Sequence, residues 1–518
     1  MQTTERLTPT LSAVACKPGS GFFDGYIACS CATAAFGVVL LGCYSDVQTR
    51  MEATQAVFHA IQVTLATVLV VITVMFELAE RVRNRIAAPL SLSAVVGLAA
   101  VAPAMLLLEL HPLIPKAAIL LVSLRLVRLL AQEANWRRAL APLLSGAVIG
   151  YWTFLLSFVD GYKTPWVNEA TMFGQVHVDL LFHSAIVNML RLYSVGSIGV
   201  DGAIPFPYYF GSHRIVEALS GILDIQPLTF YSVVFPLLLG PLFLAMFFFF
   251  AVSFQTFLLN REYFNRDSPS LRSELFWLVS AIVFIGIFPV EFRRNLGLFD
   301  NVFHSESFGI GVLVAYLPGV FFFEYIGRRS HMRLSVVWMI LGGVYLAGLC
   351  MVKFSVASVL AGTAAYLLLR LKLAWRHRLF GFLTITMPLG YGLWITRGSP
   401  SGDSGPSVME MIKPFAFLRD LIEPRLWVVS FVAFFGPFIL FVLLRLMLPR
   451  TSTRKTWPAR FRALEFLDLE VLSVLLTISV IPSLVISVPQ GSTNFFSEVS
   501  YWFVLPMLSV VLSDRLRK

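Results

Sequence analysis

Residues 160–227 read DGYKTPWVNEATMFGQVHVDLLFHSAIVNMLRLYSVGSIGVDGAIPFPYYFGSHRIVEALSGILDIQP and form a polar stretch of mixed composition in a chain that is otherwise strongly apolar. Long apolar runs precede this stretch and follow it. The pattern predicts a long loop between membrane-spanning helices. Structureless loops of this length are usually functional, so we expect the chemistry of the protein to lie here.

The composition agrees with a membrane protein. The 518 residues are 57% hydrophobic and only 14% charged, with a mean hydropathy of +0.77, whereas soluble domains carry about 25% charged residues. Runs of about 17 or more apolar residues recur along the chain, and each is long enough to cross a hydrocarbon core of ~30 Å. The sequence therefore predicts an all-α polytopic integral membrane protein.

The net charge of +10 comes from 40 Lys and Arg against 30 Asp and Glu. In a soluble protein such an excess would suggest nucleic acid as a partner. In a polytopic membrane protein it is the normal consequence of Lys- and Arg-rich cytoplasmic loops. We therefore expect membrane lipids as partners and no nucleic acid.

About fourteen apolar segments are candidates for membrane spans. They divide a single transmembrane domain into N-terminal helices (1–159), an extracytoplasmic loop (160–227) and C-terminal helices (228–518). The candidate spans are residues 26–44, 57–78, 89–110, 113–131, 139–159, 228–253, 274–291, 307–326, 334–350, 354–370, 379–396, 425–447, 469–487 and 499–513. The aromatic run 243–250, FLAMFFFF, is expected to face lipid.

The positions of Lys and Arg predict the orientation. With both termini in the cytoplasm, the Arg-rich connections lie inside, and the loops 160–227, 292–306, 397–424 and 488–498 lie outside. The segment 113–131 carries Arg125 and Arg128, which makes it the weakest candidate span. If it only lies on the membrane surface, everything before it changes side and the later loops keep theirs.

Two amphipathic helices are predicted inside the outer loop. In residues 179–191, Leu181, Ile186 and Met189 share one face at 100° per residue, and His183 falls on the other. Residues 213–223 repeat the pattern, with His213 and Glu217 on the polar side. Both helices are expected to lie in the outer interface rather than to cross the membrane.

Asp179 is the leading candidate for a general base, because His177 and His183 flank it and a carboxylate in a partly desolvated site can accept a proton from a hydroxyl group. Glu169 and Asp201 are further loop carboxylates. The alternative for each is a solvated side chain, or for Asp179 a helix cap. His177, Asp179 and His183 also have the ligand types for a divalent cation, although their spacing is not a specific metal signature.

Cationic residues predicted on the outer side suit a phosphate or a pyrophosphate. Lys353 lies between two apolar runs with almost no loop, where a charge is costly unless it faces a cavity or an anion, or extends to the interface. Arg293 and Arg294 form a second cationic group. His213 and Arg214 are candidates for the same role.

These features resemble the GT-C type glycosyltransferases, which are polytopic membrane enzymes that use a polyprenyl-phosphate-linked sugar. The resemblance rests on VHVDLLFHSAIVNML at 176–190, with Asp179 in the acidic position, and on DGAIPFPYYFGSH at 201–213. The turn at Lys353, Phe354 and Ser355 and the segment SEVSYWFVLP at 497–506 fit the same group of bacterial envelope-polysaccharide proteins. Five apolar segments precede the acidic loop here, whereas in most of these enzymes it follows the first span.

The resemblance implies a multi-pass enzyme of the bacterial inner membrane that transfers a sugar from a lipid donor to an envelope glycan or lipid. Asp179 or Glu169 would be the base, with His183 or His177 orienting it. Lys353 and Arg293 or Arg294 would stabilise the leaving phosphate, and no cofactor beyond a divalent cation is suggested.

Two alternatives stay open. An O-antigen or polysaccharide polymerase or ligase would depend on His213, Arg214 and the pair Arg293 and Arg294, with Asp179 dispensable. A transporter or lipid flippase would predict inverted repeats and charges near the membrane midplane.

Overall fold

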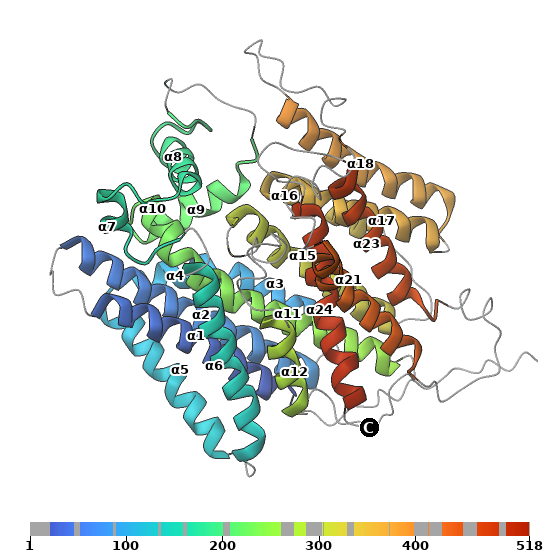
Figure 1. Cartoon of the computed structure of the whole chain (residues 1–518), viewed down its shortest axis with the longest axis horizontal. Coiled ribbons are helices and arrows are strands. Elements are labelled where there is room, and N and C mark those ends of the chain that lie inside the picture. Colours follow the sequence, from blue (N-terminus) through green and yellow to red (C-terminus); the bar gives the residue numbers. More distant parts are fainter. Residues whose placement is uncertain are drawn as a thin grey trace, which may run out of the picture.

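The computed structural model describes most of the chain, and all of its described elements are helices (Figure 1). The described residues are 21–45, 52–85, 90–132, 136–158, 163–199, 202, 208–260, 274–285, 303, 305–328, 336–371, 373–397, 413, 427–448, 464–485 and 494–516. The all-helical prediction is confirmed for this part of the chain.

The N-terminal third forms a group of long helices. They are α1 (Gly21–Ser45), α2 (Glu52–Arg85), α3 (Leu90–Ala99), α4 (Val101–Glu109), α5 (Leu113–Gln132) and α6 (Trp136–Phe158). The predicted outer loop then contains short helices, which are α7 (Val167–Met172), α8 (Val178–Tyr193) and α9 (Gly211–Ile222). The chain then continues through three consecutive helical elements without a break. They are α10 (Pro227–Thr229), the π-helix η1 (Phe230–Val234) and α11 (Phe235–Asn260).

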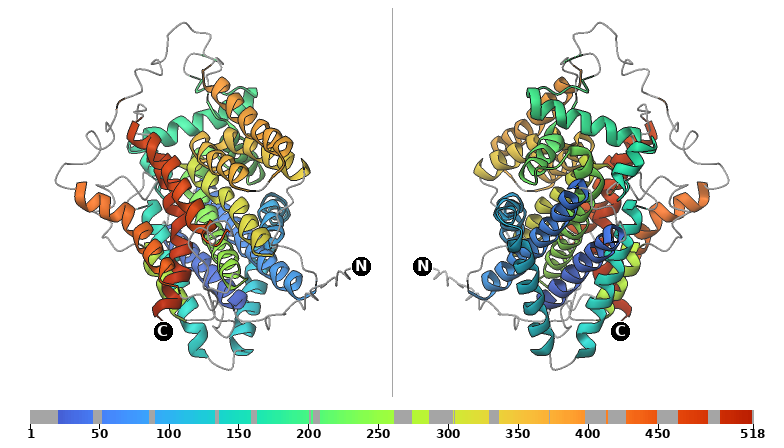
Figure 2. Two further views of the ribbon diagram at one scale, coloured as in Figure 1. Left: turned by 90° about the vertical axis from the view of Figure 1, so that its right-hand side faces the viewer. Right: turned by 90° about the vertical axis from the view of Figure 1, so that its left-hand side faces the viewer.

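The C-terminal half supplies the rest of the bundle. Its described helices are α12 (Glu274–Ile285), α15 (Glu306–Arg328), α16 (Val336–Val352), α17 (Phe354–Arg370), α18 (Trp375–Arg397), α21 (Trp427–Leu446), α23 (Leu467–Val485) and α24 (Asn494–Leu516). Both α16 and α17 pack against α18, and the three form a group beside the main bundle (Figures 1 and 2).

Eight helical segments of the described chain are long and apolar enough to cross a membrane. They are 22–44, 55–81, 90–109, 139–158, 227–260, 306–326, 467–485 and 495–516. The apolar helices at 275–284, 336–352, 354–370 and 431–446 are shorter. A multi-pass helical membrane protein is thus confirmed in its coarse form, and the count of about fourteen spans stays a prediction.

Helix α11 is the centre of the bundle. Every residue from Phe247 to Phe250 is at most 1% exposed, and Phe248 stacks on Trp277 with ring centroids 5.4 Å apart. The expectation that this aromatic run faces lipid is therefore wrong. Aromatic pairs gain free energy beyond their buried area, which explains why the innermost helix is so rich in Phe.

Contacts between distant residues show which helix ends lie together. The carboxylate of Glu324, near the end of α15, accepts hydrogen bonds from the backbone N–H groups of Leu90 and Ser91 at the start of α3. At the opposite end, the hydroxyl group of Tyr44 on α1 donates to the carbonyl oxygen of Pro165. These contacts place the start of α3 with the end of α15, and the end of α1 with the stretch before α7.

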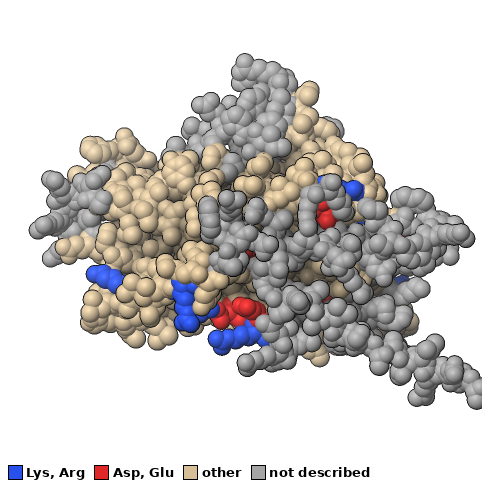
Figure 3. Space-filling view, turned by 90° about the horizontal axis from the view of Figure 1, so that it is seen from below, with Lys and Arg blue, Asp and Glu red and all other residues tan. Residues whose placement is uncertain are grey.

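Helix α5, which contains the weakest predicted span, packs along α2, and Arg125 forms an ion pair there with Glu77. Charged side chains are sparse on the described surface. Seen from below, Lys, Arg, Asp and Glu colour only a few small groups of the described surface, and most of its other atoms are tan (Figure 3).

Helices α1 and α6 pack at unusually close range. A Cβ atom built on Gly146 or Gly150 would lie 2.2 Å from the carbonyl oxygen of Ala28 or Ala32, respectively. Small residues four apart allow helix backbones to approach closely in membranes, where packing rather than the hydrophobic effect drives association.

We expect Gly150→Leu to destabilise the protein, because the new side chain meets backbone atoms that cannot move aside. Overpacking of this kind costs about 1–3 kcal/mol or more. Thermal unfolding in detergent should show a lower Tm for this variant. Gly42→Leu on α1, where a Cβ has nothing within 4 Å, is the control and should behave like the wild type. Equal Tm values for the two variants would contradict the close contact.

Candidate functional site

Helix α8 begins at a cap made by His177. Its Nδ1 accepts a hydrogen bond from the backbone N–H of Asp179 at 3.2 Å, which satisfies one of the free N–H groups of the first turn. The same Nδ1 lies 3.7 Å from Oδ2 of Asp179. His177 therefore fixes the start of the helix, and its ring lies next to the Asp179 carboxylate.

The buried faces of α8 and α9 differ from those predicted by periodicity. Helix α8 buries Leu180, Ser184 and Val187, whereas Leu181 is exposed. Helix α9 buries His213, which is 1% exposed, and leaves Ile215 partly exposed. The buried face of each helix thus mixes apolar residues with uncharged polar ones, whereas Asp179 and Arg214 stay exposed.

His183 and His213 form a hydrogen-bonded pair between the two helices. Nδ1 of His183 lies 2.9 Å from Nε2 of His213, so that one ring donates and the other accepts. The rings of Tyr208 and Tyr231 lie against the pair, with centroids 5.6 Å from His213 and 6.1 Å from His183, respectively. Burial lowers the pKa of both histidines, and that of His213 falls to about 3.

The π-helical turn η1 positions Tyr231. It precedes Pro236, which lacks the N–H group that a regular α-helical turn would use. Single π turns of this kind are frequent at functional sites. The wider turn presents the Tyr231 ring to His183 beneath the two outer helices.

Lys163 and Glu306 form a buried ion pair next to this cluster. The Nζ atom of Lys163 lies 3.0 Å from Oε1 of Glu306, and both side chains are almost fully buried. Nζ also donates to the carbonyl oxygen of Phe303 at 2.8 Å and lies 4.8 Å from the ring centroid of Phe235. Burial lowers the pKa of Lys163, and the charge of Glu306 opposes this effect.

Lys353 occupies the break between α16 and α17, where it is the N-cap residue of α17. It is only 9% exposed, and its Nζ lies 3.8 Å from the ring centroid of Phe495. Among the residues that the structure describes, its ammonium group makes no hydrogen bond and no ion pair. Glu306 and Glu498 interact with its charge from a greater distance.

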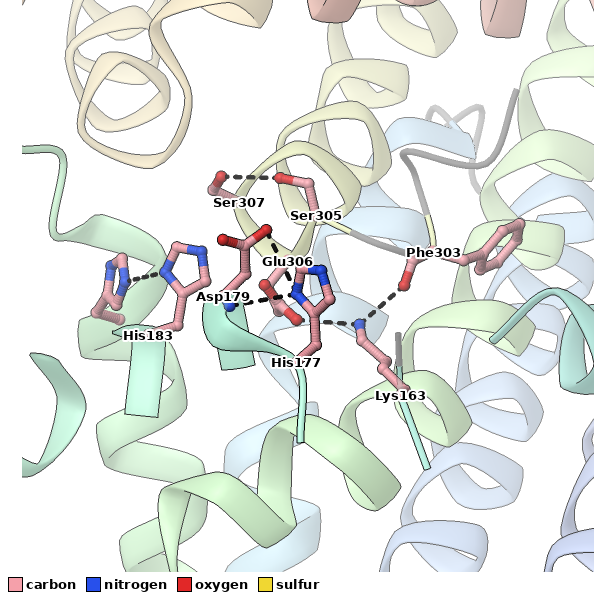
Figure 4. Close-up of polar contacts among 9 residues, drawn as sticks. Lys163, His177, Asp179, His183, Phe303, Ser305, Glu306 and Ser307 are labelled. Atoms are coloured by element: carbon pink, nitrogen blue, oxygen red, sulfur yellow. Dashed lines mark hydrogen bonds and ion pairs between the residues drawn. The ribbon is translucent and has the colours of Figure 1, made fainter. Parts of the chain in front are cut away.

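The Asp179 carboxylate lies at the same end of the bundle. It is accessible, with its side chain 53% exposed. The charges of Glu306, Asp179, Lys353 and Lys163 all act on the imidazole of His183, so these groups surround one region. Figure 4 shows His177, Asp179 and His183 in one view with the ion pair of Glu306 and Lys163.

The remaining predicted residues have different places. Arg214 lies on the exposed side of α9 and pairs with Glu217 at 2.8 Å. Glu169 lies in α7, and its side chain is outside the described part of the structure. Asp201, Arg293 and Arg294 also lie outside the described residues.

Sequence reasoning missed Lys163, Glu306 and Glu498. Each is a single charge beside an apolar run, which by itself looks like an ordinary residue at the end of a span. The available signal was that all three fall at the ends of segments assigned to the outer side.

Within the described residues, no three His, Cys, Asp or Glu side chains lie close enough together to hold a metal ion. His183 uses its Nδ1 for His213 and is not gathered with His177 and Asp179 around one point. The groups of the described site that could take part in a reaction are an accessible carboxylate, two buried lysines and a neutral histidine pair.

No known protein family, curated protein or solved structure matches the chain.

The histidine pair predicts a pH dependence of stability. Between pH 6.5 and about 3, His213 is neutral in the folded state but protonated in the unfolded chain. The unfolded state then binds more protons, so stability is complete above pH 6.5 and decreases as the pH falls through this window. At pH 4.5 the loss is roughly 2–3 kcal/mol.

Thermal unfolding at pH 7 and pH 4.5 tests this dependence. His213→Gln should show a smaller decrease in Tm on acidification than the wild type. The exposed His177→Gln variant should keep the wild-type decrease. If His213→Gln keeps the full decrease, the neutral pair is not its source.

Proposed function

We propose that the protein is a membrane glycosyltransferase that takes a sugar from a polyprenyl-phosphate-linked donor and transfers it to an envelope glycan or lipid on the extracytoplasmic side of a bacterial inner membrane. The observation that carries the proposal is Lys353, a buried ammonium group without a hydrogen bond or an ion pair among the described residues.

Three features make Lys353 costly for the fold. Its charge is buried, it has no hydrogen bond or ion pair among the described residues, and it lies at the N-terminus of α17, where the helix dipole is positive. An anion that binds there would gain from Lys353 and from the helix N-terminus together. A lipid phosphate at the level of the helix ends is an anion of suitable chemistry.

Asp179 is the best placed group to act on an acceptor. Its carboxylate is accessible, and its backbone N–H is held by the cap that His177 makes at the start of α8. It would take the proton from the acceptor hydroxyl while the hydroxyl oxygen attacks the anomeric carbon. The bond between that carbon and the phosphate oxygen then breaks, and the lipid phosphate leaves with the electron pair, stabilised by Lys353.

The other groups would position the reacting parts. The pair of Lys163 and Glu306 holds the stretch before α7 against the start of α15. The pair of His183 and His213 holds α8 against α9. Both contacts keep Asp179 above the buried charges, where small displacements strongly affect rates.

The polymerase or ligase alternative is less well supported by the described residues. It needs His213 and Arg214 to contact substrate, but His213 is buried against His183 and Arg214 pairs with Glu217. A transporter remains a second candidate, because buried ionisable groups in membrane helices often belong to transport pathways. Reconstituted vesicles that move a lipid-linked sugar without forming product would favour it.

Asp179→Asn should reduce sugar transfer roughly 100- to 10,000-fold, because the amide cannot accept the hydroxyl proton. The measurement is envelope-glycan analysis in cells that carry the variant in place of the native protein. Asp224→Asn is the control, since Asp224 is a 93% exposed carboxylate at the end of the same loop. Glu169→Gln tests the other candidate base. Normal glycans in both Asp179→Asn and Glu169→Gln cells, at normal protein level, would rule out a carboxylate base at these positions.

Lys353→Met should weaken donor use roughly 10- to 100-fold, as expected for a lost hydrogen bond to a charged group, without lowering Tm. The Met side chain keeps the apolar contacts and removes the buried charge. Lys353→Arg should retain part of the activity. A lower Tm together with unchanged glycans would assign Lys353 a structural role instead.

A further inference from the structure

A cavity of about 290 Å³ lies among α11, α15, α16, α17, α18, α23 and α24, away from the charged cluster. Its lining is almost entirely apolar and includes Leu346, Leu368 and Leu475. The lining residues come from the last parts of α15 and α17 and from the first parts of α16, α18 and α23. The charged cluster lies at the other ends of α15 and α17, so the two sites occupy opposite ends of the bundle. We call this space the basic-end cavity.

Arginine residues surround the end of the bundle that contains this cavity. Arg370 and Arg445 are neutralised there by Glu470 and Asp468, respectively. Arg376 and Arg378, in the first turn of α18, form no ion pair with the described residues. They are therefore two cations of the described chain beside the cavity that can accept an anion.

Arg378 is tied directly to the cavity wall. Its Nη2 donates to the carbonyl oxygen of Leu371 at 3.2 Å, and Leu371 lines the cavity. Its Nε is buried and has no hydrogen-bond partner in the described part of the chain. Gly381, one helical turn further along α18, is also a lining residue.

Aromatic residues mark this region as a membrane interface. Trp338 lines the cavity and is 47% exposed, and Trp375 beside the two arginines is 68% exposed. Trp side chains concentrate at the level of lipid headgroups. An apolar space next to unpaired arginines at this level matches the two parts of a phospholipid.

We propose that the basic-end cavity binds an acyl chain of an anionic phospholipid, whose phosphate contacts Arg376 and Arg378. The sequence places this end on the cytoplasmic side, where anionic lipids are abundant. The ligand is thus a membrane lipid and not the sugar donor, whose phosphate is assigned to Lys353 at the opposite end. This proposal is independent of the glycosyl transfer.

Two glycines of α16 offer a matched pair of variants. Gly342 lines the cavity and Gly348 does not, and a Cβ on either would have nothing within 4 Å. Gly342→Leu therefore fills the cavity, and Gly348→Leu adds the same side chain elsewhere on the same helix. Ala364→Leu on α17 fills the cavity from the facing side and covers the case in which Gly342→Leu is not folded.

The experiment is native mass spectrometry of the full chain, purified in mild detergent and exchanged into an equimolar mixture of phosphatidylglycerol and phosphatidylcholine. We expect the wild type and Gly348→Leu to retain about one phosphatidylglycerol, and Gly342→Leu and Ala364→Leu to retain at least tenfold less. Equal retention by the filled and control variants, with normal Tm values, would overturn the proposal.

The arginines are tested by lipid preference. Arg376→Gln combined with Arg378→Gln should bring the ratio of retained phosphatidylglycerol to phosphatidylcholine close to one. Arg81→Gln, which removes a 77% exposed arginine of α2, should keep the wild-type preference. A wild type without preference, or a double variant that keeps it, would refute the assigned headgroup contact.

Discussion

The buried ion pair between Lys163 and Glu306 is the interaction on which the candidate site depends. It joins the stretch before α7 to the first turn of α15, at the point where the outer helices meet the bundle. Two charges removed from water are stable only when they are paired closely, and the loss of one partner costs about 3–5 kcal/mol. Glu306 also favours the start of its own helix, because a carboxylate near a helix N-terminus interacts well with the dipole. The pair thus fixes where α8 and α9 can lie, and with them Asp179 and the histidine pair.

Lys353 is a second buried lysine, but within the described part of the chain it is not paired as Lys163 is. Both are buried lysines at the same end of the bundle, but among the described residues only Lys163 has a carboxylate within ion-pair distance. This difference in pairing suggests a structural role for Lys163 and a binding role for Lys353. A satisfied charge orders the fold, whereas an unsatisfied charge at a helix N-terminus stores free energy that a bound anion can recover. Because both lysines lie close to His183, the ordering contact and the proposed anion site share one electrostatic environment.

Much of the architecture could be predicted from the sequence, because apolar runs and the polar stretch 160–227 are local patterns. The short helices α8 and α9 were predictable for the same reason, as was the unusual position of Lys353 between two apolar runs. Which face of each helix is buried could not be predicted from the sequence. An aromatic run is equally apolar whether it faces lipid or protein, so Phe247 to Phe250 gave no sign that α11 is central. Likewise, periodicity separates polar from apolar residues but cannot tell that His213 of α9 is buried. The partners Lys163 and Glu306 are 143 positions apart (306 − 163), and only the tertiary fold brings them together.

Buried charges are paired differently at the two ends of the bundle, and this difference is relevant to function. At the basic end, Arg445 and Asp468 lock α21 to α23, and Arg370 and Glu470 lock α17 to the same helix. These pairs are bidentate, and therefore rigid as well as neutral. At the other end, single-point lysine contacts, a neutral histidine pair and an accessible carboxylate leave capacity for a ligand. Lys353 could have been neutralised as Arg445 is, with a gain in stability. Among the described residues, the other two fully buried cations, Lys163 and Arg445, are both paired. The missing partner of Lys353 is therefore the strongest reason to look for the substrate phosphate at that end.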